Sequence, residues 1–311
     1  MNLLITGGFG YIGGRLARSL CQDGHVVRLA SRRSRVSPKD GGRIEFATVD
    51  WDDEISLRKV CEGQDVIIHT SGLGSKECES DPAAAFRVNA MFTYRLAKTA
   101  SESRVSRLVY LSTAHVYGNP LCGRIDEDVA PANDHPYAKS NLEGENSLLS
   151  GASSSDMSVI IVRLSNVVGA PANLAPNCWT LLAGDLCKQA VLKRELVLRS
   201  NALIERDFIP MSECIRVIKY FVESVETNFQ LKVFNVGSGR SRSLIEMAAD
   251  ISDITKEKLG YHPDIVELVN RSPVSKLDYV CQRIKNLGID IKPSISQELS
   301  GMIDFVEENF K

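Results

Sequence analysis

Three glycines near the N-terminus have the spacing of a phosphate-binding turn. Gly7, Gly10 and Gly13 follow an apolar run over residues 2–6 and lead into an amphipathic segment. In that setting glycines allow a tight turn, a close approach of backbone to a pyrophosphate, and close packing of a helix on a sheet. The helix N-terminus then faces the negative charge. Because both flanking elements are present, we predict a dinucleotide-binding turn and not an empty glycine turn.

The end of the second predicted strand indicates which dinucleotide is bound. Sites that take NAD usually carry an acidic residue about 20 residues past the glycines, where it holds the adenosine ribose. Here the strand ends in Ser31, Arg32 and Arg33, with Arg35 close behind. Guanidinium groups pair with phosphate oxygens, so the segment favours the 2′-phosphate of NADP, with NAD as the alternative. A solvated basic loop is the other interpretation.

The elements that must position these residues follow from the hydrophobic pattern. Apolar runs alternate with helix-period segments through the first half of the chain, which is typical of parallel strands joined by helices. We expect strands at residues 2–6, 25–30, 44–49, 65–69, 107–111 and 158–163, and helices at 11–22, 54–61, 82–101 and 136–149. Asp81 before Pro82 is expected to cap the third helix. The fold class is therefore α/β, with a Rossmann doubly wound parallel sheet.

The pattern changes after Gly169. Residues 169–177 are rich in turn formers, and beyond them the regular alternation weakens. Helices are expected at 178–190, 212–225 and 243–258, and a strand at 233–236. We therefore predict a dinucleotide-binding Rossmann domain over residues 1–168. A smaller, partly interleaved substrate-binding region follows over 169–311, and some of its elements return to the Rossmann sheet.

Seven further segments stand in a recognisable order. They are Val49 to Trp51, Ile68 to Gly72, Arg87 to Asn89, Tyr110 to Gly118, Arg163 to Gly169, Arg206 to Ile209 and Phe234 to Gly239. With the glycine turn they make the chain resemble the extended short-chain dehydrogenases/reductases, the group of NAD(P)-dependent nucleotide-sugar epimerases, dehydratases and ketoreductases. The resemblance spans nearly the whole chain, and it is specific for the superfamily but not for a substrate.

The resemblance implies a set of binding residues. For the cofactor these are Gly7, Gly10, Tyr11, Ile12, Gly13, Ser31, Arg32, Arg33, Asp50, Trp51, Thr70, Ser71, Gly72, Asn89, Ser112, Tyr137 and Leu164. For the substrate they are Thr113, His115, Asn166, Asn177 and Arg206. Arg206 is the expected contact for a diphosphate, because a planar guanidinium pairs bidentately with phosphate oxygens. For His115, a residue that merely lines or packs in the substrate cleft is the other interpretation.

The resemblance also implies the catalytic residues. In the family a Ser or Thr hydroxyl and a Tyr phenol bracket the reacting carbinol or ketone, and the tyrosine exchanges a proton while a hydride moves to or from nicotinamide. Carried over, Thr113 is the hydroxyl donor and Tyr137 the acid/base. Thr113 lies at the carboxyl end of a predicted parallel strand, where ligands bind in such sheets.

One position departs from the family pattern. The family motif is Y-x-x-x-K, and four residues after Tyr137 this chain has Asn141. Lys139 is no substitute, because positions i and i+2 of a helix point in nearly opposite directions. Without a nearby ammonium the phenol keeps a high pKa, and Asn141 is left only hydrogen bonds to the nicotinamide ribose. We expect reduced or direction-biased activity, with loss of activity as the alternative.

These residues favour one reaction class and leave alternatives open. The family's dehydratases carry Asp-Glu after the Ser/Thr, whereas this chain has Ala114 and His115, so 4,6-dehydration is disfavoured. We expect redox chemistry at C4 of a nucleotide-diphosphate sugar, by a 4-epimerase or a 4-ketoreductase. A catalytically weakened dinucleotide sensor is the alternative that Asn141 supports. A reductase of small hydrophobic ketones fits poorly with Arg194, Arg199 and Arg206.

Composition limits the partners. The formal charge of −2 over 311 residues offers no basic face for nucleic acid. No run approaches the roughly 20 apolar residues of a membrane span, and the first residues read as a strand and not as a signal peptide. The eight cysteines are scattered without zinc spacing, so we expect no metal and reduced thiols in the cytoplasm. The resemblance implies a homodimer.

Overall fold

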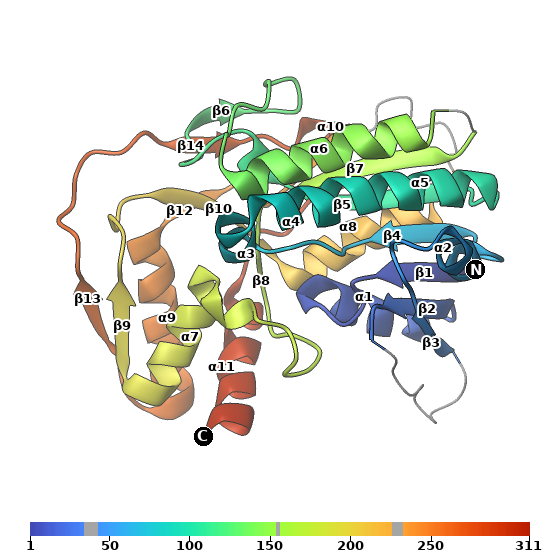
Figure 1. Ribbon diagram of the computed structural model, residues 1–311. Helices are drawn as coiled ribbons and strands as arrows, with labels where there is room; N and C mark the ends of the chain where they lie inside the picture. The colour runs from blue at the N-terminus through green and yellow to red at the C-terminus, as the bar shows by residue number, and fades with distance from the viewer. Residues whose placement is uncertain (34–42, 154–155, 226–232) are drawn as a thin grey trace. The chain divides into compact units, whose positions relative to one another are not determined.

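The computed structural model describes residues 1–33, 43–153, 156–225 and 233–311 of the protein (Figure 1). The chain divides into two compact units. The first comprises Met1–Asn119, Ala130–Arg163 and Ile215–Phe234, and the second Pro120–Val129, Leu164–Cys214 and Asn235–Lys311. The unit therefore changes at Arg163 and Leu164, a few residues before the boundary expected at residue 168.

The first unit is built on a seven-stranded sheet. Its strands are β1 (Asn2–Thr6), β2 (Val26–Ser31), β3 (Ile44–Thr48), β4 (Val66–His69), β5 (Arg107–Thr113), β7 (Ser158–Leu164) and β11 (Val233–Val236). They lie in the order β11-β7-β5-β4-β1-β2-β3. The pairs β1–β2, β1–β4, β2–β3 and β4–β5 are all parallel. The strands β1, β2 and β3 are added toward one edge of the sheet. After β3 the chain crosses back, and β4 is added on the other side of β1, as in doubly wound folds. The predicted Rossmann-type α/β fold is confirmed.

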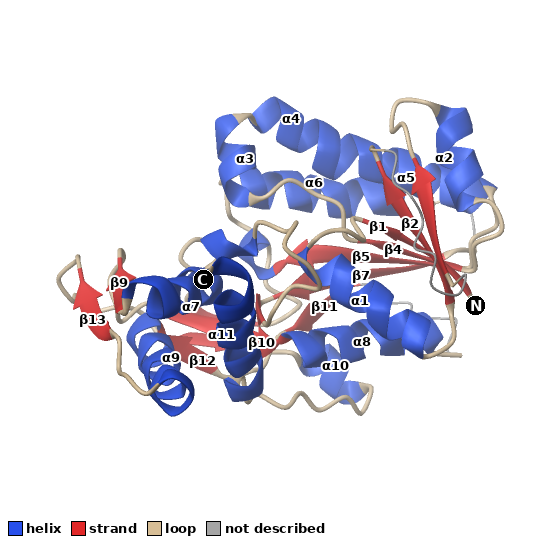
Figure 2. Cartoon of the chain, turned by 90° about the horizontal axis from the view of Figure 1, so that it is seen from below, coloured by secondary structure: helices blue, strands red, loops and turns tan. Residues whose placement is uncertain are grey.

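Helices cover both faces of this sheet. They are α1 (Tyr11–Gln22), α2 (Glu54–Cys61), α3 (Ser75–Ser80), α4 (Pro82–Phe86), α5 (Phe92–Glu102), α6 (Pro136–Gly151) and α8 (Met211–Glu223). Figure 2 shows α2, α5 and α6 on one side of the strands and α1 and α8 on the other. One core cluster joins strand residues such as Leu4 and Ile67 to helix residues such as Leu57, Leu96 and Leu148. Each fully buried leucine stabilises the fold by roughly 1.5–3 kcal/mol.

The helix expected over residues 82–101 is interrupted. Asp81 caps its start as predicted, because its carboxylate accepts the Ala84 amide at 2.9 Å. After α4 the chain forms a π-helical turn, η1 (Arg87–Met91), before α5 begins. The Thr93 hydroxyl donates to the Asn89 carbonyl oxygen at 2.8 Å, which helps to satisfy a backbone group at the wider turn. Expecting one continuous helix was wrong, and such insertions are frequent at functional sites.

The second unit contains small sheets and three long helices. Its strands are β6 (Gly123–Ile125), β8 (Asn166–Val168), β9 (Glu195–Leu198), β10 (Glu205–Pro210), β12 (Ser241–Ser243), β13 (Asp264–Glu267) and β14 (Leu277–Tyr279). They form the sheets β12-β10-β8, β13-β9 and β14-β6. The helices are α7 (Leu182–Lys193), α9 (Leu244–Leu259), α10 (Gln282–Asn286) and α11 (Ser296–Phe310), and α7, α9 and α11 supply much of its core.

Two boundaries in the second unit differ from the sequence prediction. The helix expected at 178–190 begins only at Leu182, after a 3-10 turn, η3 (Cys178–Thr180). Leu181 between them has extended backbone angles, with ψ at 149°, so the two turns cannot join into one helix. The helix expected at 243–258 begins at Leu244, because the Ser243 hydroxyl accepts the Glu246 amide as a cap. Over the described residues, no helix combines the length and the apolar character needed to cross a membrane.

Candidate dinucleotide and catalytic site

The glycine turn between β1 and α1 is packed so closely that side chains would not fit. Gly7 has a φ of 73°, and a Cβ on it would lie 2.8 Å from the Ser71 backbone nitrogen. A Cβ on Gly13 would overlap the Gly7 carbonyl oxygen. The Gly10 amide donates to that same oxygen at 2.8 Å, and Gly10 is the N-cap of α1. The turn therefore brings bare backbone to the carboxyl ends of β1 and β4, as phosphate binding requires.

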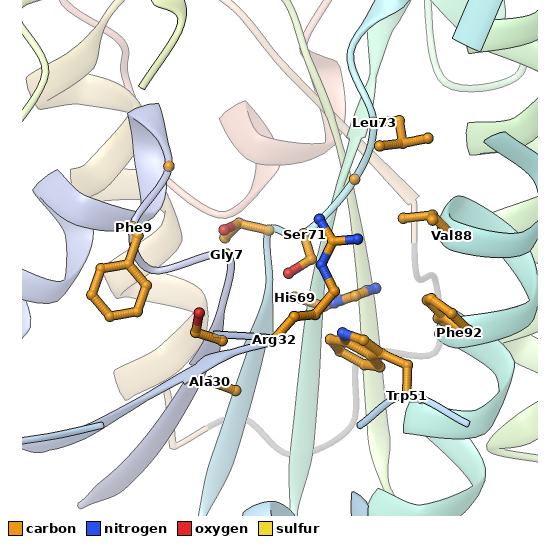
Figure 3. A pocket seen from close by; sticks show the side chains of 14 residues that line it. Gly7, Phe9, Ala30, Arg32, Trp51, His69, Ser71, Leu73, Val88 and Phe92 are labelled. Atoms are coloured by element: carbon orange, nitrogen blue, oxygen red, sulfur yellow. The ribbon is translucent and has the colours of Figure 1, made fainter. Parts of the chain in front are cut away.

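A pocket opens at this edge of the sheet (Figure 3). Its lining contains eight of the residues expected to bind the cofactor: Gly7, Gly10, Ser31, Arg32, Trp51, Thr70, Ser71 and Gly72. Six others also line it: Phe9, Ala30, His69, Leu73, Val88 and Phe92. The remaining expected residues are not among the lining residues: Tyr11, Ile12, Gly13, Arg33, Asp50, Asn89, Ser112, Tyr137 and Leu164. Val88 and Phe92 are four residues apart, a spacing that places two side chains on the same face of a helix. Sequence analysis did not use this spacing to predict that they line the pocket.

One wall of the pocket is aromatic. The Trp51 ring stacks on Phe92 with centroids 5.6 Å apart and planes 12° apart. Arg95 fixes the loop that carries Trp51, because its Nη1 donates to the Trp51 carbonyl oxygen at 2.9 Å and to the Asp52 carboxylate at 2.6 Å. The hydrogen bond from Arg87 to Asp52, with help from Arg95, lowers the pKa of that carboxyl. A flat, anchored ring of this kind suits stacking against an adenine.

The cationic rim of the pocket comes from the end of β2. Figure 3 shows the Arg32 side chain extending across the pocket near Ser71. Within the described residues, neither Arg32 nor Arg33 forms an ion pair with a carboxylate. The Ser31 hydroxyl accepts the Arg33 amide at 3.1 Å and holds the turn. Arg35 lies outside the described residues. The Arg32 guanidinium is thus available to phosphate oxygens at the pocket, and Arg33 follows it in the chain.

The expected catalytic pair meets at the carboxyl end of β5. Thr113 is the last residue of β5, and Tyr137 is the second residue of α6. The Thr113 hydroxyl is hydrogen-bonded to the Tyr137 phenol. Burial raises the pKa of Tyr137, and the bond from Thr113 opposes that rise only in part, while nearby Cys78 adds to it. The phenol therefore carries its proton at neutral pH and can donate it.

Asn141 faces the protein interior. Its Nδ2 donates to the Tyr137 carbonyl oxygen at 2.7 Å, and its Oδ1 accepts the Tyr110 hydroxyl at 3.4 Å. The Lys139 side chain is two-thirds exposed and lies 4.0 Å from the Asp134 carboxylate. In the described part of the chain, no lysine or arginine contributes to the pKa of Tyr137. The amide of Asn141 thus braces the helix and β5, a role that the sequence did not indicate.

Ser112 is bound within a buried polar cluster. Its hydroxyl donates to Glu145 Oε1 at 2.5 Å. Arg163 Nη2 donates to Glu145 Oε2 at 2.6 Å, and Arg163 Nη1 donates to the Tyr117 hydroxyl at 2.8 Å. The Glu145 and Arg163 side chains are only 4% and 7% exposed, so this is a desolvated ion pair. Glu145 was not predicted, and it fixes the carboxyl end of β5 against α6.

Asn89 connects three elements beside the pocket. Its Oδ1 accepts the Leu73 amide at 2.9 Å, and its Nδ2 donates to the Ser140 hydroxyl at 2.9 Å. The Ser140 hydroxyl in turn donates to the Tyr137 carbonyl oxygen at 3.1 Å. Asn89 is only 1% exposed. It therefore holds the loop after β4 against the first turn of α6.

His69 is a buried neutral histidine under the same pocket. Its Nε2 lies 3.0 Å from the Thr93 hydroxyl and its Nδ1 lies 2.6 Å from the Thr6 hydroxyl. Because Thr93 donates its proton to Asn89, Nε2 must donate to Thr93 and Nδ1 must accept from Thr6. Burial lowers the pKa of His69 to about 3. Its function is structural, since both nitrogens are hydrogen-bonded.

The residues expected to bind substrate lie in different places. His115 is in the 3-10 turn η2 (Ala114–Val116) of the first unit, and its amide donates to Thr113 Oγ1 at 3.1 Å. The others belong to the second unit: Asn177 is exposed, and Asn166 Nδ2 donates to the Asp207 carbonyl oxygen at 2.9 Å. Among the described residues, no group of three or more His, Cys, Asp or Glu could hold a metal ion.

Arg206 is the most informative residue of the second unit. It lies on β10, half-buried, and burial lowers the pKa of its guanidinium. No carboxylate pairs with it within the described residues. The next residue, Asp207, accepts the Ser238 and Arg240 amides at 2.8 and 3.1 Å and so orders the following loop. A desolvated guanidinium without a counterion is suited to an anionic ligand.

The fold and the pocket together define a dinucleotide-binding enzyme of the Rossmann type. A family model described as the NAD dependent epimerase/dehydratase family matches residues 3–237. The chain therefore belongs to the NAD-dependent epimerase/dehydratase family. This confirms the predicted family resemblance and the expectation of an enzyme.

Individual relatives agree with this assignment. Human dTDP-D-glucose 4,6-dehydratase is 24% identical over 99% of this chain and 90% of its own. UDP-glucose 4-epimerase of Dictyostelium discoideum is 27% identical over 83% of each chain. A solved UDP-glucuronic acid 4-epimerase from Bacillus cereus, in complex with UDP-glucuronic acid and NAD, superposes with a TM-score of 0.82 over 99% of both chains at 21% identity. That structural likeness confirms the fold.

Proposed function

We propose that the protein carries out redox chemistry at C4 of a nucleotide-linked sugar, as a 4-ketoreductase or a 4-epimerase. The observation that carries this proposal is the hydrogen-bonded Thr113–Tyr137 pair at the carboxyl end of β5. The named relatives act on or bind dTDP- and UDP-sugars, which supports a nucleotide-diphosphate sugar as substrate.

The residues present fit a nicotinamide dinucleotide. Gly7 and Gly13 leave a cradle that a Cβ would fill, α1 directs its N-terminus to a pyrophosphate, and Trp51 offers a face to adenine. A nicotinamide bound there would supply or accept the hydride. Tyr137 gives a proton to, or takes it from, the substrate oxygen, and Thr113 orients that oxygen. Because the pKa of Tyr137 is raised, the phenol carries its proton in the free protein, and that is the protonation state from which reduction of a ketone starts.

For the cofactor we propose a preference for NADP over NAD. Arg32 lines the pocket, and no acidic residue occupies the end of β2. The solved relative from Bacillus cereus carries NAD, so the test must compare both cofactors. Titration of the Trp51 fluorescence should show tighter binding of NADPH than of NADH, and Arg32→Ala should remove at least half of the difference in binding free energy. Equal affinities in the unmodified protein would contradict the preference.

For the substrate we propose that Arg206 binds the diphosphate. Its guanidinium is desolvated and has no carboxylate partner within the described residues, and a phosphate would supply the missing charge. Arg206→Lys keeps the charge but loses the bidentate geometry, so the KM for the nucleotide sugar should rise while binding of the dinucleotide stays unchanged. An unchanged KM for Arg206→Ala would exclude this role.

We also propose a homodimer in a reducing compartment, the cytoplasm. Exposed apolar side chains lie along α4, η1, α5 and α6: Phe86, Met91, Tyr94 and Leu149. In Figure 1 α4, α5 and α6 form a single layer of helices. Tyr94→Glu should convert a dimer to a monomer in light scattering, and a monomeric unmodified protein would contradict the proposal. The eight cysteines are all free thiols, which supports the compartment.

The decisive experiment is turnover by the purified protein. UDP-glucose, UDP-glucuronic acid, dTDP-glucose and their 4-keto derivatives are incubated with each nicotinamide cofactor, and products are identified by mass and by sugar proton NMR. We expect turnover of at least one 4-keto sugar, lost in Tyr137→Phe. If the unmodified protein binds the cofactor but behaves like Tyr137→Phe with every compound, the sensor alternative suggested by Asn141 replaces the enzyme.

A further inference from the structure

A chain of four hydrogen bonds connects the two residues of the catalytic pair. Thr113 Oγ1 accepts the His115 amide at 3.1 Å, and Asn133 Nδ2 donates to the His115 carbonyl oxygen at 2.7 Å. Asn133 Oδ1 then accepts the His135 amide at 3.0 Å, and His135 Nδ1 accepts the Tyr137 amide at 3.2 Å. We call residues 133–137 the strap. Its bonds run unbroken from the Thr113 hydroxyl to the Tyr137 backbone.

The strap sets where α6 begins. His135 is the N-cap of the helix, and Pro136 at the first helical position has no N–H, so the Tyr137 amide is the first donor that needs a partner. At the other end, the Asn133 amide donates to the Val116 carbonyl oxygen at 3.2 Å and attaches the strap to η2. The strap therefore fixes the start of α6 relative to the turn that follows Thr113.

The imidazole makes one of these bonds dependent on pH. Nδ1 of His135 accepts the Tyr137 amide only while it has a lone pair, which places the ring proton on Nε2. A second proton removes the acceptor and puts positive charge at a helix N-terminus, where the dipole disfavours it. The charged or titratable residues that the chain and these hydrogen bonds bring next to His135 are Asp134 and Lys139, which pair with each other, together with His115 and Tyr137. A cap of the usual type, Ser, Thr, Asn or Asp, would keep its oxygen acceptor under the same acidification.

We infer that Asn133 and His135 are positioning residues which hold Tyr137 against Thr113, and that protonation of His135 releases this hold. The inference rests on the proposed function, because the distance between Thr113 and Tyr137 matters for activity only if the two residues act together on a substrate. It predicts an enzyme whose activity falls as His135 is protonated, through a change in the position of Tyr137, while the Tyr137 phenol keeps its proton.

The first test needs no substrate. In isotope-labelled protein, the ring nitrogens of His135 and the backbone amide of Tyr137 are followed by NMR as the pH falls. The inference requires that the Tyr137 amide shift and its protection from hydrogen exchange change together with His135 protonation. His135→Asn should keep the Tyr137 amide constant throughout, and the control replacement His262→Asn, at a histidine whose side chain is 49% exposed, should behave like the unmodified protein. If the shift and the exchange protection of the Tyr137 amide stay constant while His135 is protonated, the inference is overturned.

The second test uses whichever nucleotide sugar is turned over. The kcat of the unmodified protein should fall in acid, His135→Asn should remove that fall, and His135→Ala should lower kcat about tenfold at every pH, because small misplacements of reacting groups are costly. Asn133→Ala removes the donor to His115 and the acceptor for His135 without adding a titratable group, so kcat should fall while its dependence on His135 protonation remains. If kcat still falls in acid in His135→Asn, the inference is overturned. If no sugar is turned over, the NMR test still decides it.

Discussion

Replacing Glu145 tests how the buried ion pair supports the site. Glu145→Ala removes the carboxylate that accepts the Ser112 hydroxyl at 2.5 Å and Arg163 Nη2 at 2.6 Å. The Arg163 guanidinium would stay buried without its counterion. Glu145→Gln keeps the shape and loses the charge. Glu143→Ala on the same helix is the matched control, since Glu143 forms no ion pair within the described residues.

The size of the effect follows from burial. Both partners are below a tenth exposed, so the desolvation of Arg163 stays uncompensated in Glu145→Ala, and the free energy of unfolding should fall by about 3–5 kcal/mol. Replacing both partners with apolar residues, Glu145→Leu with Arg163→Met, removes the stranded charge as well. The double variant should therefore be more stable than Glu145→Ala. The control Glu143→Ala should stay within about 0.5 kcal/mol.

Urea denaturation followed by far-UV circular dichroism measures these differences. Because Ser112 precedes Thr113, we also expect Glu145→Ala to lower turnover at concentrations of urea where the protein is still folded. A loss below about 1 kcal/mol for Glu145→Ala would refute the reasoning. A double variant that is less stable than Glu145→Ala would also refute the reasoning. The unpaired charge of Arg163 would then not be the cause of the loss of stability.

Three further predictions concern single residues. Asn141→Lys should lower the pKa of Tyr137 in a phenol absorbance titration, because an ammonium would oppose the effect of burial, and an unchanged titration would exclude an electrostatic role for a lysine at this position. Thr113→Val should raise that pKa further and reduce kcat about a hundredfold, measured against Tyr137→Phe. The pKa of His69 is lowered to about 3, so its contribution to stability is full above pH ~6.5 and is lost as the pH falls toward 3, by roughly 1.4 kcal/mol per unit. His69→Gln should flatten that slope in acid denaturation, and an equal slope would contradict the assignment.

The parts of the fold that the sequence predicted well are those with local signals. The boundaries of β1, α1 and α2 agree with the apolar periodicity, and the glycine turn lies where its spacing placed it. The π-helical turn at Arg87–Met91 was missed because its extra residue leaves the local pattern of a helix almost unchanged. Short strands of the second unit were missed for a related reason, since three residues carry too little periodicity.

The candidate site was predicted in its residues more than in its contacts. The motif placed Thr113 near Tyr137, and it showed that the lysine is replaced by Asn141. It could not show that this amide turns to Tyr110 and the Tyr137 carbonyl, because that orientation depends on a strand 31 residues away. The role of Glu145 could not be predicted for the same reason. Tertiary packing decides that it meets Arg163 and Ser112 in the core.

The choice between an enzyme and a silent sensor depends on features that cost stability. A half-buried guanidinium that meets no carboxylate among the described residues, as at Arg206, is unfavourable in the absence of ligand, and a protein that only reports cofactor state gains nothing from it. The Tyr137 phenol is held by the Thr113 hydroxyl and the Tyr137 backbone amide by the His135 cap, which is likewise more order than a cofactor pocket needs. The pocket residues account for dinucleotide binding without either feature. On the proposed function both have an explanation, diphosphate binding and proton transfer, and we therefore expect the loss of the motif lysine to change the rate or direction of catalysis and not to abolish it.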